Sequence, residues 1–264
     1  KLWESVELYD LNVPFVNSTP LEVLLINEAL AEKLDVIEVS DNELVLQMER
    51  GRLFAVLRPG RHVFWKAWNR FTYQKVNTAE ATIDASLDDT ILMHPSMAYF
   101  VRMYKLEVYE KGLLFVDGRF DRILEAGNYI WWKNNIVIHV IKTDIRQQQM
   151  DIPGQEILTK DKAQIRVNLN LQYRVTDIVK ALYENKDYDK QLYAAMQMAV
   201  REIVGSLTLD ELMERKELAA AQVLQLAKGR AEALGVTVTD GGLKDINLPG
   251  DMRDIMNQVL IAEK

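Results

Sequence analysis

Tryptophan followed by lysine ends two similar phrases of this sequence. Trp65 precedes Lys66, and the pair Trp131 and Trp132 precedes Lys133. An indole ring beside an ammonium group suits the boundary between lipid headgroups and acyl chains. Successive residues of a strand face opposite ways, so at least one of Trp131 and Trp132 should instead lie in a core, the commoner role. The candidates for membrane contact or for packing between the two copies of the phrase are Trp65, Trp68, Trp131 and Trp132.

Residues that do chemistry in enzymes are present but are not arranged for it. No HExxH, GxSxG, P-loop or DxDxDG pattern occurs, and three histidines stand in unrelated contexts: His62, His94 and His139. Asp210, Glu211 and Glu214 fall on what should be the solvated face of a helix, where charges are common and catalytic pairs are rare. Cysteine is absent, which excludes disulfides and thiolate nucleophiles. We therefore predict no catalytic residue, no cofactor and no metal site, and a protein that is not an enzyme.

Charge and hydropathy narrow the class of partner. The chain has 264 residues, 48% of them apolar and 27% charged, enough for two or three small domains with real cores. Its net charge of −7 would repel a phosphate backbone, so no nucleic-acid partner is predicted. The best apolar run, residues 21–26, is far shorter than a membrane-spanning helix. The first residue is lysine, so we expect the natural protein to contain residues upstream.

The two phrases belong to an internal duplication. Residues 51–66 read GRLFAVLRPGRHVFWK and residues 118–133 read GRFDRILEAGNYIWWK, with an offset of 67. The identical pairs are Gly51/Gly118, Arg52/Arg119, Leu57/Leu124, Gly60/Gly127, Trp65/Trp132 and Lys66/Lys133. Asp117-Gly118 between apolar runs is a strong hairpin signal. Each copy is predicted to be a small antiparallel β module whose turns are formed by Gly51, Gly60, Gly118 and Gly127.

A third, partial copy and two connectors complete the repeat pattern. Residues 3–12 resemble residues 68–77, sharing Trp3/Trp68 and Asn12/Asn77, which suggests that the chain begins inside a truncated repeat. Residues 27–34 and 96–105 are predicted to be short helices that start after the N-caps Asn27 and Ser96. Each β module is then followed by a helical connector.

After residue 151 the pattern changes to longer elements. Residues 164–175 alternate apolar and polar without error, which predicts a long strand with one wet face. Helices are predicted over 187–205, 208–214 and 216–234, followed by a strand or bulged strand pair over 235–249. A further helix then starts, and its apolar positions are candidate oligomer contacts: Met252, Ile255, Met256 and Val259.

These segments resemble, in order and spacing, the SPFH or Band 7 domain of stomatins, slipins, prohibitins and flotillins. The resemblance is carried by EVYEKGLLFVDGRFDRILEAGNY (107–129), MDIPGQEILTKDKAQIRVNLNLQYRV (150–175), AAMQMAVREIVGSLTLDELMERKEL (194–218) and GVTVTDGGLKDINLP (235–249). It implies a β-rich half and an α/β half that lead into a coiled-coil helix. It also implies a scaffold that forms ring- or cage-like homo-oligomers, organises membrane microdomains, and regulates a membrane protease or binds an NfeD-like protein.

Two features depart from the family pattern. The hydrophobic hairpin of ordinary stomatins is missing, and additional β modules occupy residues 1–104. Gly241 and Gly242 interrupt a strand where relatives carry a β-branched and a charged residue, so a bulge or bend is expected there. Tandem β modules before an SPFH domain also resemble vault-type proteins. The alternatives are a soluble vault-like wall or cage protein and, in another class, a hydrolase or small-ligand-binding protein.

The sequence thus predicts an α+β chain, in which tandem small antiparallel β modules precede an SPFH-type α/β module and the start of a long C-terminal helix. The expected segments are a truncated repeat with its connector (1–35), a complete β repeat with its connector (36–104), a second β repeat that forms the first half of the SPFH domain (105–151), its α/β second half (152–248), and the start of a long helix or coiled coil (249–264). The resemblance implies homo-oligomers at a lipid surface. It places the protein peripherally on the cytoplasmic face of a membrane, with a soluble cytoplasmic protein as the alternative.

Overall fold

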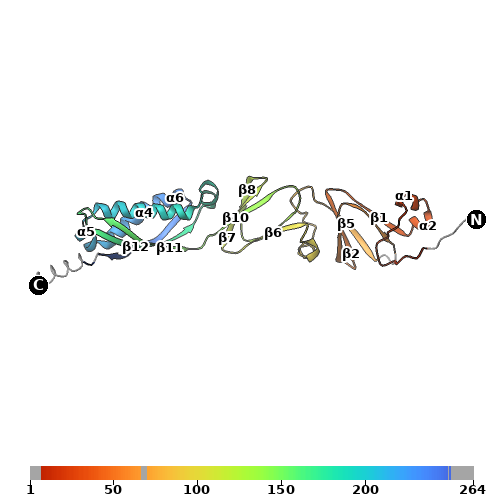
Figure 1. Ribbon diagram of the computed structural model, residues 1–264, viewed down its shortest axis with the longest axis horizontal. Coiled ribbons are helices and arrows are strands. Elements are labelled where there is room, and N and C mark those ends of the chain that lie inside the picture. Colours follow the sequence, from red (N-terminus) through yellow and green to blue (C-terminus); the bar gives the residue numbers. More distant parts are fainter. Residues whose placement is uncertain (1–6, 67–69, 249, 251–264) are drawn as a thin grey trace, which may run out of the picture. The chain divides into compact units, whose positions relative to one another are not determined.

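The computed structural model describes residues 7–66, 70–248 and 250 (Figure 1). The chain divides into two compact units. Unit 1 comprises the residues up to Tyr104 together with Asn128–Ile138, and unit 2 comprises Lys105–Gly127 and the residues from His139 onward. The fold is α+β, with several small antiparallel sheets in both units and the longer helices in unit 2.

Ten strands repeat in two sets of five with the offset of 67. The first set is β1 (Leu34–Val39), β2 (Glu43–Glu49), β3 (Arg52–Leu57), β4 (Gly60–Trp65) and β5 (Phe71–Asn77). The second set is β6 (Val101–Leu106), β7 (Glu110–Val116), β8 (Arg119–Leu124), β9 (Gly127–Trp132) and β10 (Ile138–Asp144). In each set the first and fourth strands form a two-stranded sheet, and the other three form a sheet with the second strand in the middle. Equal strand bounds and equal pairing order show that the two copies share one β fold.

The repeated glycine turns close the hairpins β2–β3 and β7–β8. Arg50 and Gly51 have φ of 51° and 77°, and Asp117 and Gly118 have φ of 48° and 76°. Two central residues with positive φ give the turn whose twist matches antiparallel strands, and glycine adopts that region at no steric cost. Gly60 and Gly127 are the first residues of β4 and β9.

Asx turns mark the same point of three successive repeats. The side-chain oxygens of Asp10, Asn77 and Asp144 each accept a hydrogen bond from the backbone N–H two residues on, at 2.8, 2.7 and 2.8 Å. Such bonds let Asp and Asn end a strand and start a turn. The front segment therefore follows the offset of 67, which aligns Asp10 with Asn77. The sequence pairing of Asn12 with Asn77 was wrong by two residues, because a shared asparagine outweighed the equivalent turn geometry of a neighbouring aspartate.

Short helical turns follow the Asx turns as connectors. They are α1 (Leu21–Leu24), α2 (Glu28–Ala31), α3 (Asp89–Leu92) and the 3-10 turn η2 (Pro95–Met97). Asn27 is the N-cap of α2 as predicted, its side chain accepting from the Leu30 N–H. The predicted helix over 96–105 was wrong: His94 is the N-cap of η2, and residues from Val101 form strand β6. The alternating burial of β6 shows why, since period two overrides the helical spacing.

Unit 1 has a core that both repeats share. Sheet β3-β2-β5 contributes from the first repeat, sheet β6-β9 from the second, and the connector lies between them in sequence. The buried members are Leu44, Leu46, Val76, Leu87, Leu92, Met97, Val101 and Trp132. The sequence repeat and the packing unit are therefore out of step, because a core forms between the second sheet of one copy and the first sheet of the next.

Unit 2 contains sheet β10-β7-β8 and sheet β11-β12-β13, made of β11 (Gln148–Leu158), β12 (Gln164–Val175) and β13 (Val236–Asn247). The α-helices α4 (Tyr188–Ser206), α5 (Leu209–Glu214) and α6 (Lys216–Ala233) match the predicted helices within about one residue. Figure 1 shows α4 and α6 on one face of the second sheet, where they cover the apolar side of β12. The predicted alternation of 164–175 is confirmed, since its apolar positions are buried in turn.

Strand β13 is continuous through the glycine pair. Gly241 and Gly242 lie opposite Leu171 and Asn170, and the register shifts fall on either side, at Thr239 and Lys244. The expected bulge at the glycines was therefore wrong in position. A Cβ on Gly241 would lie 2.9 Å from Leu224 of α6 and 2.8 Å from a backbone oxygen, so this glycine allows close packing of the helix on the strand.

Candidate functional site

The structure places two of the four candidate tryptophans inside unit 1. Trp131 is 5% exposed and packs against Tyr104 at 5.7 Å and Tyr129 at 5.8 Å between ring centroids. Trp132 is 1% exposed and belongs to the core shared by the two repeats. Both rings can lie in cores because β9 is enclosed on both sides. Neither indole is exposed at the surface of unit 1.

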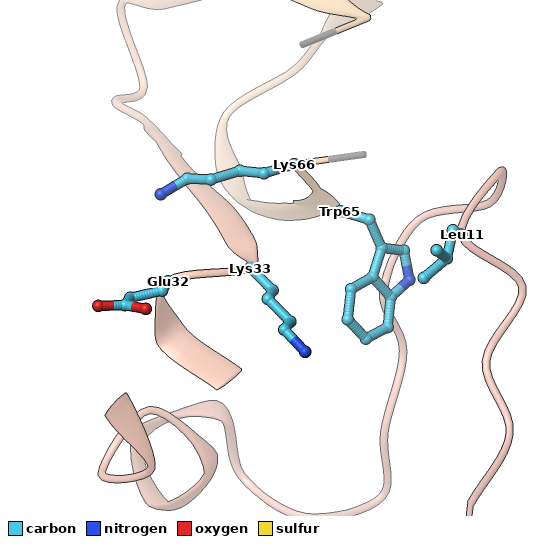
Figure 2. A pocket seen from close by; sticks show the side chains of 5 residues that line it. All are labelled: Leu11, Glu32, Lys33, Trp65 and Lys66. Atoms are coloured by element: carbon cyan, nitrogen blue, oxygen red, sulfur yellow. The ribbon is translucent and has the colours of Figure 1, made fainter. Parts of the chain in front are cut away.

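Trp65 occupies the equivalent position of the first repeat but is only half-buried. Its ring contacts Tyr9 at 5.5 Å and Phe15 at 5.1 Å, both from the segment ahead of β1. Trp65 lines a hollow of about 430 Å³. Figure 2 shows the Lys33 side chain extending toward the same space. The other lining residues are Leu11, Glu32 and Lys66. Trp68 lies outside the described residues, as do Met252, Ile255, Met256 and Val259.

The carboxylates considered for catalysis have structural positions. Asp210, Glu211 and Glu214 are exposed on α5. Glu211 forms a capping box with Thr208, in which each side chain bonds the other's backbone N–H. Within the described ranges, no three of the residue types that ligate metals come close enough to hold an ion.

The histidines also have local contacts of their own. His62 Nε2 lies 2.8 Å from the Arg58 carbonyl oxygen, and His94 caps η2. His139 lies with its ring centroid 6.3 Å from that of Phe115. The described contacts of these three rings are a backbone contact, a helix cap and an aromatic contact, all of which are structural.

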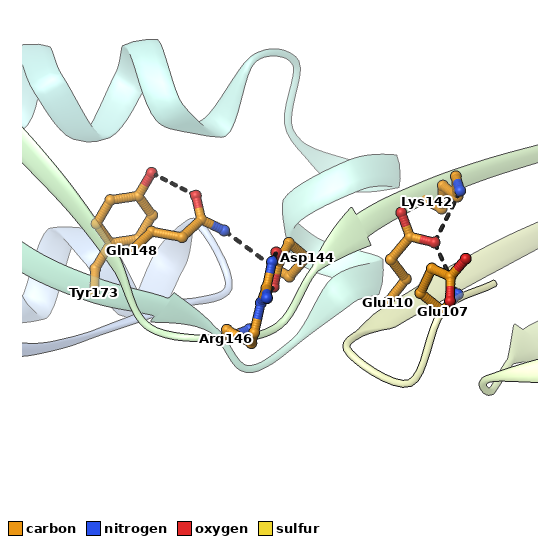
Figure 3. Close-up of polar contacts among 7 residues, drawn as sticks. All are labelled: Glu107, Glu110, Lys142, Asp144, Arg146, Gln148 and Tyr173. Carbon is orange, nitrogen blue, oxygen red and sulfur yellow. Dashed lines mark hydrogen bonds and ion pairs between the residues drawn. The ribbon is translucent and has the colours of Figure 1, made fainter.

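A polar network in unit 2 joins the end of β10 to the start of β11 (Figure 3). Gln148 donates to the Asp144 carbonyl oxygen at 3.0 Å and accepts from Tyr173 of β12 at 3.2 Å. Asp144 pairs with Arg146, whose guanidinium carbon lies 3.8 Å from the ring centroid of Tyr109. These contacts fix the direction of the chain as it enters the α/β sheet.

Two carboxylates drawn in Figure 3, Glu110 and Asp144, are held ionised by their neighbours. The backbone N–H of Glu107 and, next, the Lys142 ammonium at 2.8 Å keep the pKa of Glu110 below its usual value. The Arg146 guanidinium lowers the pKa of Asp144 in the same way. Carboxylates that are ionised and paired with cations are poor proton donors, so the arrangement suits a structural joint better than acid catalysis.

An exposed apolar rim in unit 2 was not predicted from the sequence. It consists of Phe120, Ile123 and Tyr183, which are 37%, 44% and 58% exposed. Tyr183 stacks on Phe120 at 5.9 Å and also contacts the buried Phe115 at 5.7 Å. A register shift in the β7–β8 pair brings Phe120 and Ile123 to the same face of the sheet. On that face they are the cross-strand partners of Phe115 and Leu113. Alternation alone would put Phe120 and Ile123 on opposite faces of the strand. The bulge therefore explains why the sequence pattern did not predict this surface.

The rim lies on a sheet face of the second repeat. The equivalent face of the first repeat is covered. At the equivalent positions, Leu53 and Val56 are partly buried against the core of unit 1. In unit 2 the end of β12 and the π-helical turn after it bury Leu113 and Phe115 in a core with Val175, Ile178 and Ala181, but leave Phe120 and Ile123 partly exposed. Arg119 and Arg122 of the same strand are exposed on its other face, where they pair with Val116 and Leu114 of β7.

No helix in the described part of the chain is both long enough and apolar enough to cross a membrane.

Comparison with known proteins finds relatives that match about three fifths of this chain. An uncharacterized protein of Methanocaldococcus jannaschii is 34% identical over 160 residues, which is 59% of this chain and 77% of that protein. A stomatin homolog of Pyrococcus horikoshii is 31% identical over 157 residues, 59% of this chain and 58% of the relative. Stomatin-2 of Caenorhabditis elegans is 28% identical over 164 residues, 61% of this chain and 43% of the relative.

The chain thus spans between 43% and 77% of the length of these relatives. Residues 104–264 match the SPFH domain / Band 7 family. The match begins within strand β6 and takes in the second β repeat, the polar joint and the α/β sheet with its helices. It covers more than half of the sequence, and we conclude that the chain belongs to the SPFH domain / Band 7 family.

Proposed function

We propose that this protein is a non-enzymatic scaffold that binds the surface of a membrane through its SPFH unit. Family membership supports a scaffold role at membranes, as in the stomatins among its relatives. The observation that carries the proposal is the apolar rim of Phe120, Ile123 and Tyr183. Exposed aromatic and aliphatic side chains of this kind can insert between lipid headgroups.

The rim also explains how binding would work without Trp131 and Trp132. Both are enclosed by unit 1, so they stabilise the repeats and leave lipid contact to exposed residues. Trp65 remains a second, weaker candidate because it is half-buried. The net charge of −7 disfavours long-range attraction to an anionic surface, so apolar contact must supply most of the binding energy.

Vesicle co-sedimentation tests the proposal. The double variant Phe120→Ser with Tyr183→Ser should bind vesicles of phosphatidylcholine and phosphatidylglycerol about tenfold or more weakly than the unmodified chain, since each lost ring removes roughly 1.5 kcal/mol or more of apolar burial. Val108→Ser is the matched control, because Val108 is 86% exposed in the turn between β6 and β7 and lies outside the rim. Equal binding by all three proteins would contradict the role of the rim. No binding by the unmodified chain would contradict the membrane role.

The scaffold is further proposed to act as a ring- or cage-like homo-oligomer that organises a membrane microdomain and regulates a membrane protease, alone or with an NfeD-like protein. Similar modules present similar faces, and repeated contacts between copies close rings or extend filaments. Multi-angle light scattering of the whole chain should give assemblies much heavier than 30.4 kDa. A monomer at high protein concentration would contradict oligomerisation and leave the rim to be tested separately by vesicles.

The shared core of the two repeats favours one alternative, a soluble vault-like wall or cage protein. Successive β modules that interlock through apolar cores can build a wall without lipid. Large assemblies by light scattering, together with no vesicle binding, would support this alternative and contradict the membrane scaffold.

A further inference from the structure

The first repeat carries a face whose counterpart in the second repeat is covered. The counterpart is formed by the connector after β5 with sheet β6-β9, and sheet β3-β2-β5 covers it in the core of unit 1. In the first repeat the same positions are formed by residues 10–33 with sheet β1-β4. The backbone is equivalent: Lys66 N–H donates to the Lys33 carbonyl at 2.8 Å, as Lys133 N–H donates to the Phe100 carbonyl at 2.7 Å.

In the first repeat, the side chains of this face are less buried than their counterparts in the second repeat. Leu92, Met97 and Trp132 are 4%, 0% and 1% exposed. Their counterparts Leu25, Leu30 and Trp65 are all only half-buried.

A fourth pair of positions gives the largest contrast. Val16 is 79% exposed, whereas its counterpart Ile83 is packed against the core. An apolar face that is buried in one copy and open in the other indicates a docking surface. We call Val16, Leu25, Leu30 and Trp65 the front face.

The segment that ends at Asp10 corresponds to one strand of the sheet that would cover the front face. In unit 1 the last strand of the covering sheet, β5, supplies Val76 to the core and ends at the Asx turn of Asn77. By the offset of 67, Tyr9 stands at the position of Val76 and Asp10 at that of Asn77. The Tyr9 ring does contact Trp65, at 5.5 Å. The segment that ends at Asp10 therefore meets the front face as the end of β5 meets its own.

We propose that the front face docks a β hairpin equivalent to β2–β3, which completes a sheet with the segment ending at Asp10. The occupant is a hairpin from a further repeat of the same kind, joined ahead of that segment. Its core-facing side carries apolar residues at the positions of Leu44 and Leu46. A second copy of the described chain does not fit this role, because the faces of β2 and β7 that could supply it are buried in the two cores.

A lysine at the edge of the front face limits which charge the occupant can carry there. In unit 1 the Arg58 guanidinium carbon lies 5.4 Å from the ring centroid of Phe100. Lys33 replaces Phe100 in the front face, so an arginine in the occupant would meet a like charge. The occupant carries an acidic or neutral residue at the position of Arg58.

The absence of cysteine from the sequence makes a labelling test direct. Two single-cysteine variants of the whole chain are needed, Val16→Cys on the front face and Val108→Cys as the exposed control. A second pair carries an added repeat, in which residues 10–76 replace residues 1–9 and Arg58→Glu is made in the added copy. This junction keeps the register in which Asn77 and Asp10 correspond. The rate of maleimide labelling is measured for all four proteins.

The added repeat should slow labelling of Val16→Cys at least about tenfold, because a cysteine in a core reacts only after local opening. Labelling of Val108→Cys should not change. Leu44→Asp with Leu46→Asp in the added copy should restore the fast rate, and arginine at position 58 of that copy should give partial protection. An added copy that fails to protect Val16→Cys, whether folded or unfolded by hydrogen exchange, would overturn the proposal.

The 264-residue chain itself separates other occupants. Its Val16→Cys rate should be the same at low and high protein concentration, and with or without phosphatidylcholine–phosphatidylglycerol vesicles. Protection that rises with concentration would mean that a second copy covers the face, and protection by vesicles would mean that lipid does. Either result would overturn the assignment to a repeat hairpin.

Discussion

Trp65 and Trp132 show how one residue type at equivalent positions acquires different roles. Both come after the same turn and precede the same lysine, yet one is half-buried and the other is 1% exposed. The difference arises from the cover over the strand, since only Trp132 meets the leucines of a neighbouring sheet. The sequence correctly limits such tryptophans to packing or lipid, but burial depends on a partner that the local pattern does not name.

Replacing these tryptophans should separate the two environments. Trp132→Ala should lower the free energy of unfolding of unit 1 by about 3–5 kcal/mol, because it removes a large ring from a closed core. Trp65→Ala should cost only about 1–2 kcal/mol, because part of its ring is already in water. Urea unfolding followed by hydrogen exchange of unit 1 measures both. Equal losses would mean that the front face is as well covered as the shared core.

Asp161 gives a residue-scale prediction about acid. Its carboxylate accepts from the Thr159 hydroxyl and from the Leu209 N–H at the start of α5, at 3.2 Å, and these bonds lower its pKa, with Thr159 the larger cause. A depressed pKa in the folded state means that this stabilisation is complete above the unfolded pKa of roughly 4 and is lost as pH falls through the folded value.

The stability of unit 2 should therefore fall below about pH 4, and Asp161→Asn should flatten that dependence. Denaturant midpoints between about pH 2 and pH 6 test this for the unmodified chain and the variant. Thr159→Val is a second variant that should also weaken the acid dependence, since it removes the main cause of the shift. An acid limb unchanged in both variants would contradict the role of this carboxylate.

At the scale of elements, the end of α6 depends on one backbone conformation. Gly235 comes just after the helix with φ of 73°, and its carbonyl accepts from Thr176 and Asp177 N–H groups at 3.0 Å. An added Cβ would overlap the Asp177 carbonyl oxygen and lie 2.9 Å from the Ala181 nitrogen. The glycine thus both ends the helix and lets the chain pass close to the turn after β12.

Two glycine-to-alanine changes should have opposite signs. Gly235→Ala should destabilise unit 2 by about 2 kcal/mol or more, through strain at positive φ and the overlap. Gly229→Ala, in the exposed interior of α6 where an added Cβ meets nothing within 4 Å, should stabilise it by about 0.5–1 kcal/mol. Thermal unfolding of the two variants provides the comparison. Destabilisation by both changes would show that helix packing, not backbone strain, decides the effect.

The sequence predicts those elements whose own periodicity is strong. Strand β12 and helices α4 to α6 can be predicted from alternation or helical spacing over many residues, which local physics alone supports. The segment 96–105 and the glycines of β13 were mispredicted because each depends on a neighbour: β6 pairs with β9, and Gly241 accommodates Leu224. The apolar rim was missed for a similar reason, since a bulge moves Phe120 across the strand.

At the scale of the whole molecule, the two repeats differ in the module that packs on their three-stranded sheets. The middle strands β2 and β7 present equivalent leucines, Leu46 and Leu113, both 0% exposed. In unit 1, Leu46 is buried in the core that combines the connector with sheet β6-β9. In unit 2, Leu113 is buried with Val175, Ile178 and Ala181 of the α/β module. The α/β module thus takes the place that the next β repeat takes in unit 1.

Alanine at these two positions should therefore disturb different segments. Leu46→Ala should raise amide exchange in unit 1, over the connector 78–100 and strands β6 and β9, and leave residues 175–184 protected. Leu113→Ala should do the reverse, raising exchange over 175–184 in unit 2. Each change should cost about 2–5 kcal/mol in its own unit, as for other leucines truncated in closed cores. Hydrogen exchange by mass spectrometry resolves the segments, and Val108→Ala, at an exposed turn, should change neither. Exchange that rises in both units for either variant would show that the cores are coupled, because independent cores lose protection only where the cavity is made.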